Sequence, residues 1–285
     1  MQKLLDEYRR SLKMPEAEEL LDLVFYRPIA FLFVKIIYRL PITPNQVTIL
    51  SMIAGIIAGR YFAIGTSAAL ILAAFWYAFA NILDCSDGQL ARLQNSGTAL
   101  GRIVDGVADY ISSVAIFLGI GFGLSGGSQW LLVIAAGISS APQAVVFDHY
   151  QNEFISSVRR EENFLEKEQE RFAETIRRSK EEKANVWKRF FIRMYLAYLG
   201  LQTKFGSKKA GAGYSPEAYR RSHHVMIRFW SFLGPTTNRS LLIVCALLNR
   251  VDVFLWAVVL PANMWLMCCI ILQRRIDKRL RYAQE

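Results

Sequence analysis

Four aspartates at helical spacing are the residues of this sequence best suited to chemistry. Asp84 and Asp87 are three residues apart, and Asp105 and Asp109 are four apart, so on helices each pair projects from one face. Four carboxylates in one place repel one another unless cations neutralise them, and oxygen ligands suit Mg²⁺, Mn²⁺ or Ca²⁺. The spacing therefore indicates a divalent-metal site, which would also neutralise the phosphates of a substrate.

Small residues accompany these carboxylates. Gly88, Ala91 and Gly101 share the expected helix faces one turn along, and their lack of bulk would let a flat base or a pyrophosphate approach the backbone closely. Arg92 would supply positive charge at the same place. The stretch from Asp84 to Asp109 thus predicts a pocket for a phosphorylated ligand.

The elements that must position these residues are membrane helices. Of the 285 residues, 53% are hydrophobic and 20% charged, and no residue from Tyr110 to Phe147 carries a formal charge. Because about 20 residues cross the hydrocarbon as a helix, this run must hold two spans, which turn at the Gly- and Ser-rich segment 124–128. We expect an all-α integral membrane protein with six spans, the other four at 46–63, 67–83, 235–249 and 253–273.

Charge sets the expected orientation. Threading six spans alternately gathers all Lys and Arg except Arg60 and Arg250 on one side, together with both termini and the aspartates. By the positive-inside rule that side is cytoplasmic, so we expect a multi-pass protein of the cell or inner membrane. A cleavable signal is not expected, because acidic residues precede the first apolar run.

Polar segments flank the spans. Leu20 to Leu40 mixes apolar and basic residues and suits a helix lying in the membrane interface. Glu153 to Lys183 is a long polar stretch that indicates a cytosolic helix, with a partner surface as the alternative. We divide the chain into a cytosolic N-terminus with the interfacial helix (1–44), four spans (45–148), a charged cytosolic insertion (149–221), and an interfacial segment with two spans and a basic tail (222–285).

Composition excludes other classes of protein. The net charge of +10 would suit nucleic acid, an anionic membrane or phosphorylated substrates. No nucleic-acid-binding module accompanies the charge, so we expect membrane lipids as partners and no nucleic acid. The cysteines have no metal-ligand spacing and are expected to be buried thiols, not disulfides or zinc ligands; they are Cys85, Cys245, Cys268 and Cys269.

The aspartate stretch resembles a known family. Its pattern, D-x2-D-G-x2-A-R-x8-G-x3-D-x3-D, matches the signature of the CDP-alcohol phosphotransferases at every fixed position from Asp84 to Asp109. Pro44-Asn45 at the start of the first span, after an interfacial helix, is also similar to that family. The likeness extends from about Leu20 to the fourth span, whereas the C-terminal half is less diagnostic.

The resemblance implies roles for individual residues. Asp84, Asp87 and Asp105 would ligate Mg²⁺ or Mn²⁺, two ions being expected, and Asp109 would act as ligand and general base. Residues that would bind substrate are Asn45, Gly88, Ala91, Arg92 and Gly101. Members of the family bind a CDP-linked alcohol, let the hydroxyl of a second alcohol attack the β-phosphorus, and release CMP.

Alternatives remain open at this point. We expect CDP-diacylglycerol as the donor and a polar alcohol as the acceptor in phospholipid synthesis, with a soluble CDP-polyol donor as the alternative. A cation transporter could also use intramembrane aspartates, but transport sites tend to lie at the midplane within repeats, and the sequence shows no repeat. Aspartates that only cap helix ends are the remaining interpretation. The sequence is also compatible with a homodimer.

Basic residues of the C-terminal half are further candidates. Arg239, one turn after Pro235, would either contact a polyanion in the site or extend to the lipid headgroups. Arg228 has the weaker claim as a substrate-binding residue, although with Arg239, Lys208 and Lys209 it would attract a soluble anion to the active-site face. His223 and His224 precede an aromatic stretch, which favours an interfacial belt over a catalytic histidine.

Overall fold

The computed structural model describes residues 2–124, 127–159 and 215–282. Every regular element in these ranges is a helix. The elements are α1 (Gln2–Ser11), the π-helix η1 (Asp22–Tyr26), α2 (Arg27–Ile37), α3 (Pro44–Ile64), α4 (Ser67–Gln94), α5 (Ala99–Gly123), α6 (Gly127–Arg159), α9 (Pro216–Trp230), the 3₁₀ turn η2 (Ser231–Leu233), α10 (Pro235–Leu247), α11 (Val251–Val259) and α12 (Pro261–Tyr282). The expectation of an all-α protein is confirmed for the described part of the chain.

Five helical segments in the described ranges are long and apolar enough to cross a membrane, where six were expected. They are Pro44–Ile64, Ser67–Gln94, Gly101–Gly123, Gln129–Arg159 and Val251–Leu280. The expected fifth span is α10, which has 13 residues. At 1.5 Å per residue it is about 20 Å long, which is less than the hydrocarbon thickness of about 30 Å.

Two local features set the lengths of the C-terminal helices. α10 ends at Leu247, and the chain turns at Asn249, which has a left-handed φ of 57°. The expected last span is interrupted at Leu260, where α11 ends and Pro261 begins α12. Proline has no N–H to donate to the preceding turn, so the interruption follows from the residue itself.

Glycines bring α3 and α5 into backbone contact. A Cβ built at Gly59 would lie 2.5 Å from the carbonyl oxygen of Ala115, and one at Gly55 would lie 2.7 Å from the hydroxyl of Ser112. Gly119 likewise lies directly against the carbonyl of Gly59. Such spacing of small residues is typical of close helix pairs in membranes. α3 packs as extensively on α4, and thus carries both helices of the aspartate stretch.

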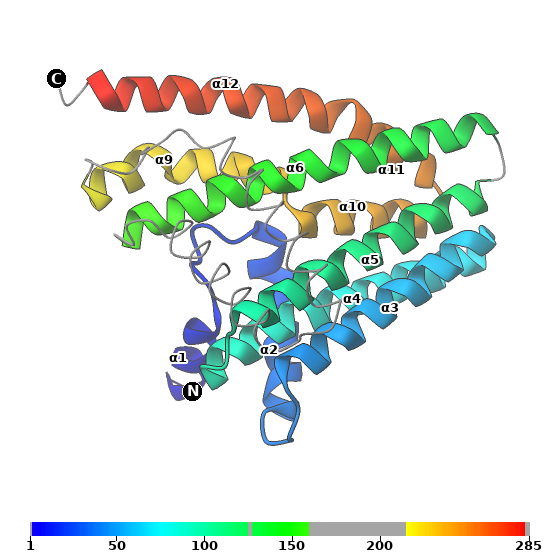
Figure 1. The fold of residues 1–285 in the computed structure, drawn as a ribbon, viewed down its shortest axis with the longest axis horizontal. Coiled ribbons are helices and arrows are strands. Elements are labelled where there is room, and N and C mark those ends of the chain that lie inside the picture. Colours follow the sequence, from blue (N-terminus) through cyan, green and yellow to red (C-terminus); the bar gives the residue numbers. More distant parts are fainter. Residues whose placement is uncertain (1, 125–126, 160–214, 283–285) are drawn as a thin grey trace, which may run out of the picture.

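The helices form a bundle in which α3, α4 and α5 run side by side (Figure 1). The C-terminal end of α12 lies at the end of the bundle where α1 and α9 are found (Figure 1). The C-terminus of α4 and the N-terminus of α5 are joined by residues 95–98, and α10 packs against α4. The aspartates therefore lie in roughly the last three turns of α4 and the first three turns of α5, where α10 approaches α4.

Several expectations outside the spans have mixed outcomes. The expected helix over Leu20 to Leu40 is present as η1 and α2, whereas α1 was not anticipated. Its placement in the membrane interface stays a prediction. The expected cytosolic helix from Glu153 begins as the last turns of α6, and its remainder lies outside the described residues. Three cysteines are buried as expected, but Cys268 is exposed on the outer face of α12.

Candidate active site

Three carboxylates converge where α4 meets α5. Oxygen atoms of Asp84, Asp87 and Asp105 all lie within 4.8 Å of one another. α4 contributes two of these residues and α5 the third, and Asp87 is buried while the other two are half-buried. An all-oxygen donor set of this kind fits a hard divalent cation such as Mg²⁺ or Mn²⁺.

Thr48 of α3 fixes the buried member of this cluster. Its hydroxyl donates to Asp87 Oδ2 at 2.5 Å, and both side chains are buried. Thr48 lies in the turn that follows Pro44, and α3 begins there with a capping box between Thr43 and Gln46. The sequence analysis missed Thr48, because only the contact between α3 and α4 gives it a role.

Arg239 of α10 reaches the same place. Its Nη1 donates to Asp84 Oδ2 at 2.7 Å and to Asn81 Oδ1 at 2.9 Å, and its Nη2 donates to Asp109 Oδ1 at 2.6 Å. Of the two sequence interpretations, the structure supports contact with the aspartates, not extension to the headgroups. Asp109 is thereby paired with a guanidinium and is not a member of the three-carboxylate group. The sequence analysis also missed Asn81, which accepts a hydrogen bond from Arg239.

Space is tight around the small residues of the stretch. A Cβ at position 101 would lie 3.1 Å from Asn45 Oδ1 and 3.2 Å from Thr98 Oγ1, so Asn45 does lie beside Gly101. A Cβ at Gly88 would lie 3.3 Å from Arg92 Nη2. Ala91 is half-buried on the last turns of α4. Two pairs of the expected pocket-lining residues are therefore in contact, Gly101 with Asn45 and Gly88 with Arg92.

Arg92 has a structural role that the sequence did not reveal. Its Nε donates to the carbonyl oxygen of Ser11 at 2.5 Å and so ties the end of α1 to α4. Its Nη2 is buried next to Gly88 and has no hydrogen-bond partner among the described residues.

Other expected site residues lie elsewhere. Arg228 donates to the carbonyl oxygens of Pro15 and Glu18, so it holds the N-terminal segment and does not contact the aspartates. His223 is buried, stacks on Tyr219 and lies 2.9 Å from Asp277 of α12. These contacts place His223 in the packing between α9 and α12. His224 is exposed, and Lys208 and Lys209 lie outside the described residues.

Three converging carboxylates and the adjacent Arg239, with its two ion pairs, form a site that can hold a divalent cation beside a phosphorylated ligand. Asp84 and Asp87 lie about two to three turns before the end of α4, and Asp105 and Asp109 lie about two to three turns after the start of α5. Both helices are continuous, whereas transport sites are usually built on broken helices.

Comparison with known proteins identifies this part of the chain. Residues 41–149 match the CDP-alcohol phosphatidyltransferase family. A phosphatidylinositol phosphate synthase from Corynebacterium glutamicum is 34% identical over 123 residues, which are 43% of this chain and 48% of the relative. An archaetidylinositol phosphate synthase from Pyrococcus horikoshii is 34% identical over 89 residues, or 31% and 46% of the two chains. A bifunctional IPC transferase and DIPP synthase from Thermococcus kodakarensis is 41% identical over 68 residues, or 24% and 15%.

These alignments span half or less of each relative. The segment that matches contains α3, α4, α5 and most of α6, with all four aspartates, Thr48 and the glycines between them. Residues 41–149 of this chain therefore match a CDP-alcohol phosphatidyltransferase domain, and this match holds all four aspartates.

Proposed function

We propose that this protein is a metal-dependent phosphotransferase of the membrane that moves a substituted phosphate from CDP-diacylglycerol to the hydroxyl of a phosphorylated polyol and releases CMP. The observation that carries the proposal is the convergence of Asp84, Asp87 and Asp105 within 4.8 Å, inside the segment that matches the family.

Asp84, Asp87 and Asp105 would hold the divalent cations, with Mg²⁺ or Mn²⁺ favoured by their oxygen ligands. When bound, such cations neutralise the pyrophosphate of the donor and stabilise charge on the attacking and leaving oxygens. The hydrogen bond from Thr48 holds Asp87 in the orientation that the cluster needs. Gly88 and Gly101 have no Cβ, so the nucleotide would reach their backbone once the side chains of Arg92 and Asn45, which lie against them, move aside.

Asp109 is the residue we assign as general base. Its side chain is 41% exposed, so an acceptor hydroxyl can reach it, and Arg239 holds its Oδ1 at 2.6 Å. Fixing one carboxylate oxygen orients the other, Oδ2, for the proton of the hydroxyl. Arg239 would also offset the repulsion between the aspartates and the incoming phosphates.

The proposed transfer balances without a covalent enzyme intermediate. The acceptor oxygen forms a bond to the β-phosphorus of the donor, and the bond from that phosphorus to the oxygen bridging to the α-phosphate breaks. The bridging oxygen leaves with the electron pair as part of CMP, and the acceptor proton passes to Asp109.

The choice of substrates rests on the relatives. Two of them are named as inositol phosphate lipid synthases, which supports a phosphorylated polyol such as an inositol phosphate as the acceptor. The expected cluster of four basic residues does not support it, because Arg228 binds the N-terminal segment and only Arg239 of the described pair reaches the aspartates. A soluble CDP-polyol donor is the less favoured alternative.

The test is CMP release by the purified full chain in lipid nanodiscs. CDP-diacylglycerol would be supplied with inositol phosphate, glycerol phosphate, inositol or glycerol, and a CDP-polyol would be supplied with a lipid alcohol. We expect release only with CDP-diacylglycerol and most rapidly with a phosphorylated acceptor. Release from the CDP-polyol alone would overturn the donor assignment and leave the reaction class intact.

Orientation is part of the proposal. α1 and the C-terminal end of α12 lie at the same end of the bundle as the start of α5 (Figure 1), and this end collects the basic last turns of α1 and α12. We infer that it faces the cytoplasm, where the soluble acceptor is found. Modification of a cysteine introduced at exposed Lys3 by an impermeant reagent in intact cells would contradict this orientation.

A further inference from the structure

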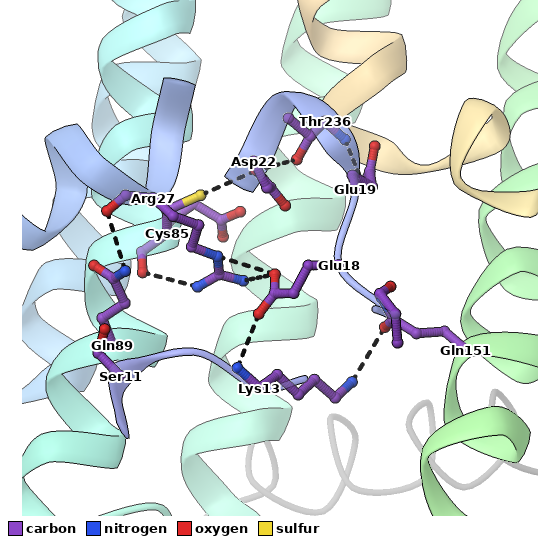
Figure 2. A network of polar contacts seen from close by, with 12 residues as sticks. Ser11, Lys13, Glu18, Glu19, Asp22, Arg27, Cys85, Gln89, Gln151 and Thr236 are labelled. Atoms are coloured by element: carbon purple, nitrogen blue, oxygen red, sulfur yellow. Dashed lines mark hydrogen bonds and ion pairs between the residues drawn. The ribbon is translucent and has the colours of Figure 1, made fainter. Parts of the chain in front are cut away.

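An N-terminal segment crosses the bundle between α4 and α10. We call residues 12–21, between α1 and η1, the N-terminal arm. The arm carries Glu18 and Glu19, which are both 3% exposed, and it is followed by Asp22, which is also buried. Burial of three carboxyl groups is costly unless each has partners, so their contacts indicate what the arm does. Figure 2 shows these contacts.

Glu19 binds the start of α10. One carboxyl oxygen accepts from the backbone N–H of Thr236 at 3.1 Å, and the other accepts from the N–H and hydroxyl of Thr237, each at 2.8 Å. The N-cap residue of α10 is Gly234, which has no side chain to cap the helix. A Cβ at Gly234 would collide with the Glu19 carboxyl group. Glu19 therefore caps α10 from a distant part of the chain.

Asp22 joins α10 to α4 directly. Its Oδ1 accepts from the Thr236 hydroxyl at 3.0 Å and from Cys85 Sγ at 3.5 Å, and Cys85 is the neighbour of Asp84 (Figure 2). The link from α10 to the aspartates thus runs through two hydrogen bonds on one carboxyl oxygen.

Arg27 fastens the same segment to α4. It pairs with Glu18 at 2.9 Å, donates to the carbonyl oxygen of Cys85 at 3.3 Å, and accepts from Gln89 through its own carbonyl at 3.1 Å (Figure 2). Through Arg27, Glu18 of the arm is therefore joined to α4 beside the aspartates, and the next residue, Glu19, holds the first turn of α10.

We propose that Glu19 is a positioning residue for Arg239. Arg239 is one helical turn after Thr236 and must meet Asp84 and Asp109 at once, so its reach depends on where α10 begins relative to α4. Glu19 sets that start by binding two first-turn N–H groups, which have no partner within the helix, of a helix that is only 13 residues long. The inference rests on the proposed function for its kinetic consequence, but the positioning itself can be measured separately.

The kinetic test compares Glu19→Ala with Glu19→Gln and with the control Glu16→Gln. Glu16 is on the same arm, but its partner Arg220 is exposed. Loss of a cap of this kind should lower kcat for CMP release by about tenfold in Glu19→Ala, whereas Glu19→Gln, which keeps one acceptor oxygen, should recover most of the activity. Glu16→Gln should behave as the unaltered protein.

A double-mutant cycle separates positioning from general destabilisation. If Glu19 acts through Arg239, Glu19→Ala should change kcat less than about twofold in an Arg239→Gln background, since the group that it positions is gone. Equal losses in both backgrounds, with thermal unfolding unchanged, would overturn the inference and leave the proposed function untouched.

A distance measurement tests the positioning without activity. Spin labels on Phe75 of α4 and Val244 of α10, which are both exposed, would be placed in a chain whose exposed Cys268 is serine. Glu19→Ala should broaden or shift the distance distribution, and Glu19→Gln should restore it. If Glu19→Ala broadens the distribution but the unaltered protein releases no CMP, the positioning would be supported and the proposed function refuted. An unchanged distribution in folded Glu19→Ala would refute the positioning.

Discussion

The hydroxyl of Thr48 on α3 donates a 2.5 Å hydrogen bond to Asp87 on α4, inside a buried contact between the two helices. The bond connects a residue outside the aspartate pattern to the most buried carboxylate of the cluster. α3 therefore contributes a side chain to the candidate site, in addition to packing against α4 and α5.

Replacing Thr48 by valine should lower kcat/KM for CMP release by about tenfold, because a buried carboxylate would lose a donor worth roughly 1.5 to 3 kcal/mol. Thr48→Ser keeps the hydroxyl and serves as the control. Activation by Mn²⁺ should require a higher concentration in Thr48→Val than in Thr48→Ser. Identical activation curves for the two variants would show that the bond does not influence the cluster.

Removal of divalent cations should abolish activity. Asp84, Asp87 and Asp105 repel one another at separations below 4.8 Å, and bound Mg²⁺ or Mn²⁺ would offset that repulsion. CMP release should therefore stop in excess EDTA and return when either cation is added back. Undiminished release in EDTA would contradict the metal site.

Asp84→Asn and Asp109→Asn should affect different kinetic quantities. Asp84 belongs to the three-carboxylate group, so its amide should weaken cation and nucleotide binding. Asp109 lies outside that group and is held by Arg239, so its amide should chiefly lower kcat. Titration of Mn²⁺ into each variant, followed by initial rates, separates the two effects. Equal loss of donor affinity in both variants would refute the division of roles.

Arg239→Gln should raise the KM for the donor or the acceptor and lower kcat, because one guanidinium serves both Asp84 and Asp109. Arg239→Lys should recover little, since an ammonium group cannot reproduce the planar fork that spans two carboxylates. Thermal unfolding checks that both variants are folded. Kinetics like those of the unaltered protein in folded Arg239→Gln would remove Arg239 from the site.

The stability of the protein should fall as pH rises through the range in which Glu19 ionises. Burial, and then the negative charge of Asp22, raise the pKa of Glu19 from 4.5 to about 8, despite opposing hydrogen bonds from Thr237 and Thr236. Glu18 and Arg27 flank Asp22 in the same cluster. Between about 4.5 and about 8 the folded protein therefore keeps a proton on Glu19 that the unfolded chain has lost.

The stabilisation from this proton is complete below about 4.5 and is lost as pH approaches about 8. Glu19→Gln does not titrate, so its unfolding temperature in detergent should decline less over that interval, with Glu16→Gln as the control. Parallel declines for Glu19→Gln and the unaltered protein would assign the pH dependence to other groups.

Local pattern predicted part of this architecture well. The spacing from Asp84 to Asp109 was enough to place the aspartates on facing helices, and Pro44 was enough to start α3. α4 and α5 extend about two to three turns beyond the aspartates, so the expected position at the helix ends was wrong. Contacts between distant segments could not be read in this way. Thr48 and Glu19 look ordinary in the sequence, because their partners are 39 and more than 200 residues away.

Hydropathy did not predict the lengths of the helices in the C-terminal half. A window average does not register that α10 ends at Leu247 or that Pro261 divides the last apolar run. Arg239 was left between two interpretations, because its depth depends on the start of α10, and that start depends on Glu19.

The glycine contact between α3 and α5 has a consequence for how lipid can approach. A single methyl group at Gly59 or Gly119 already collides with the opposite backbone. The interface between α3 and α5 therefore has no space for an acyl chain. A lipid donor that enters from the bilayer must therefore pass between other helices. Because α5 packs much less extensively on α6 than on α3, we expect the donor to enter between α5 and α6.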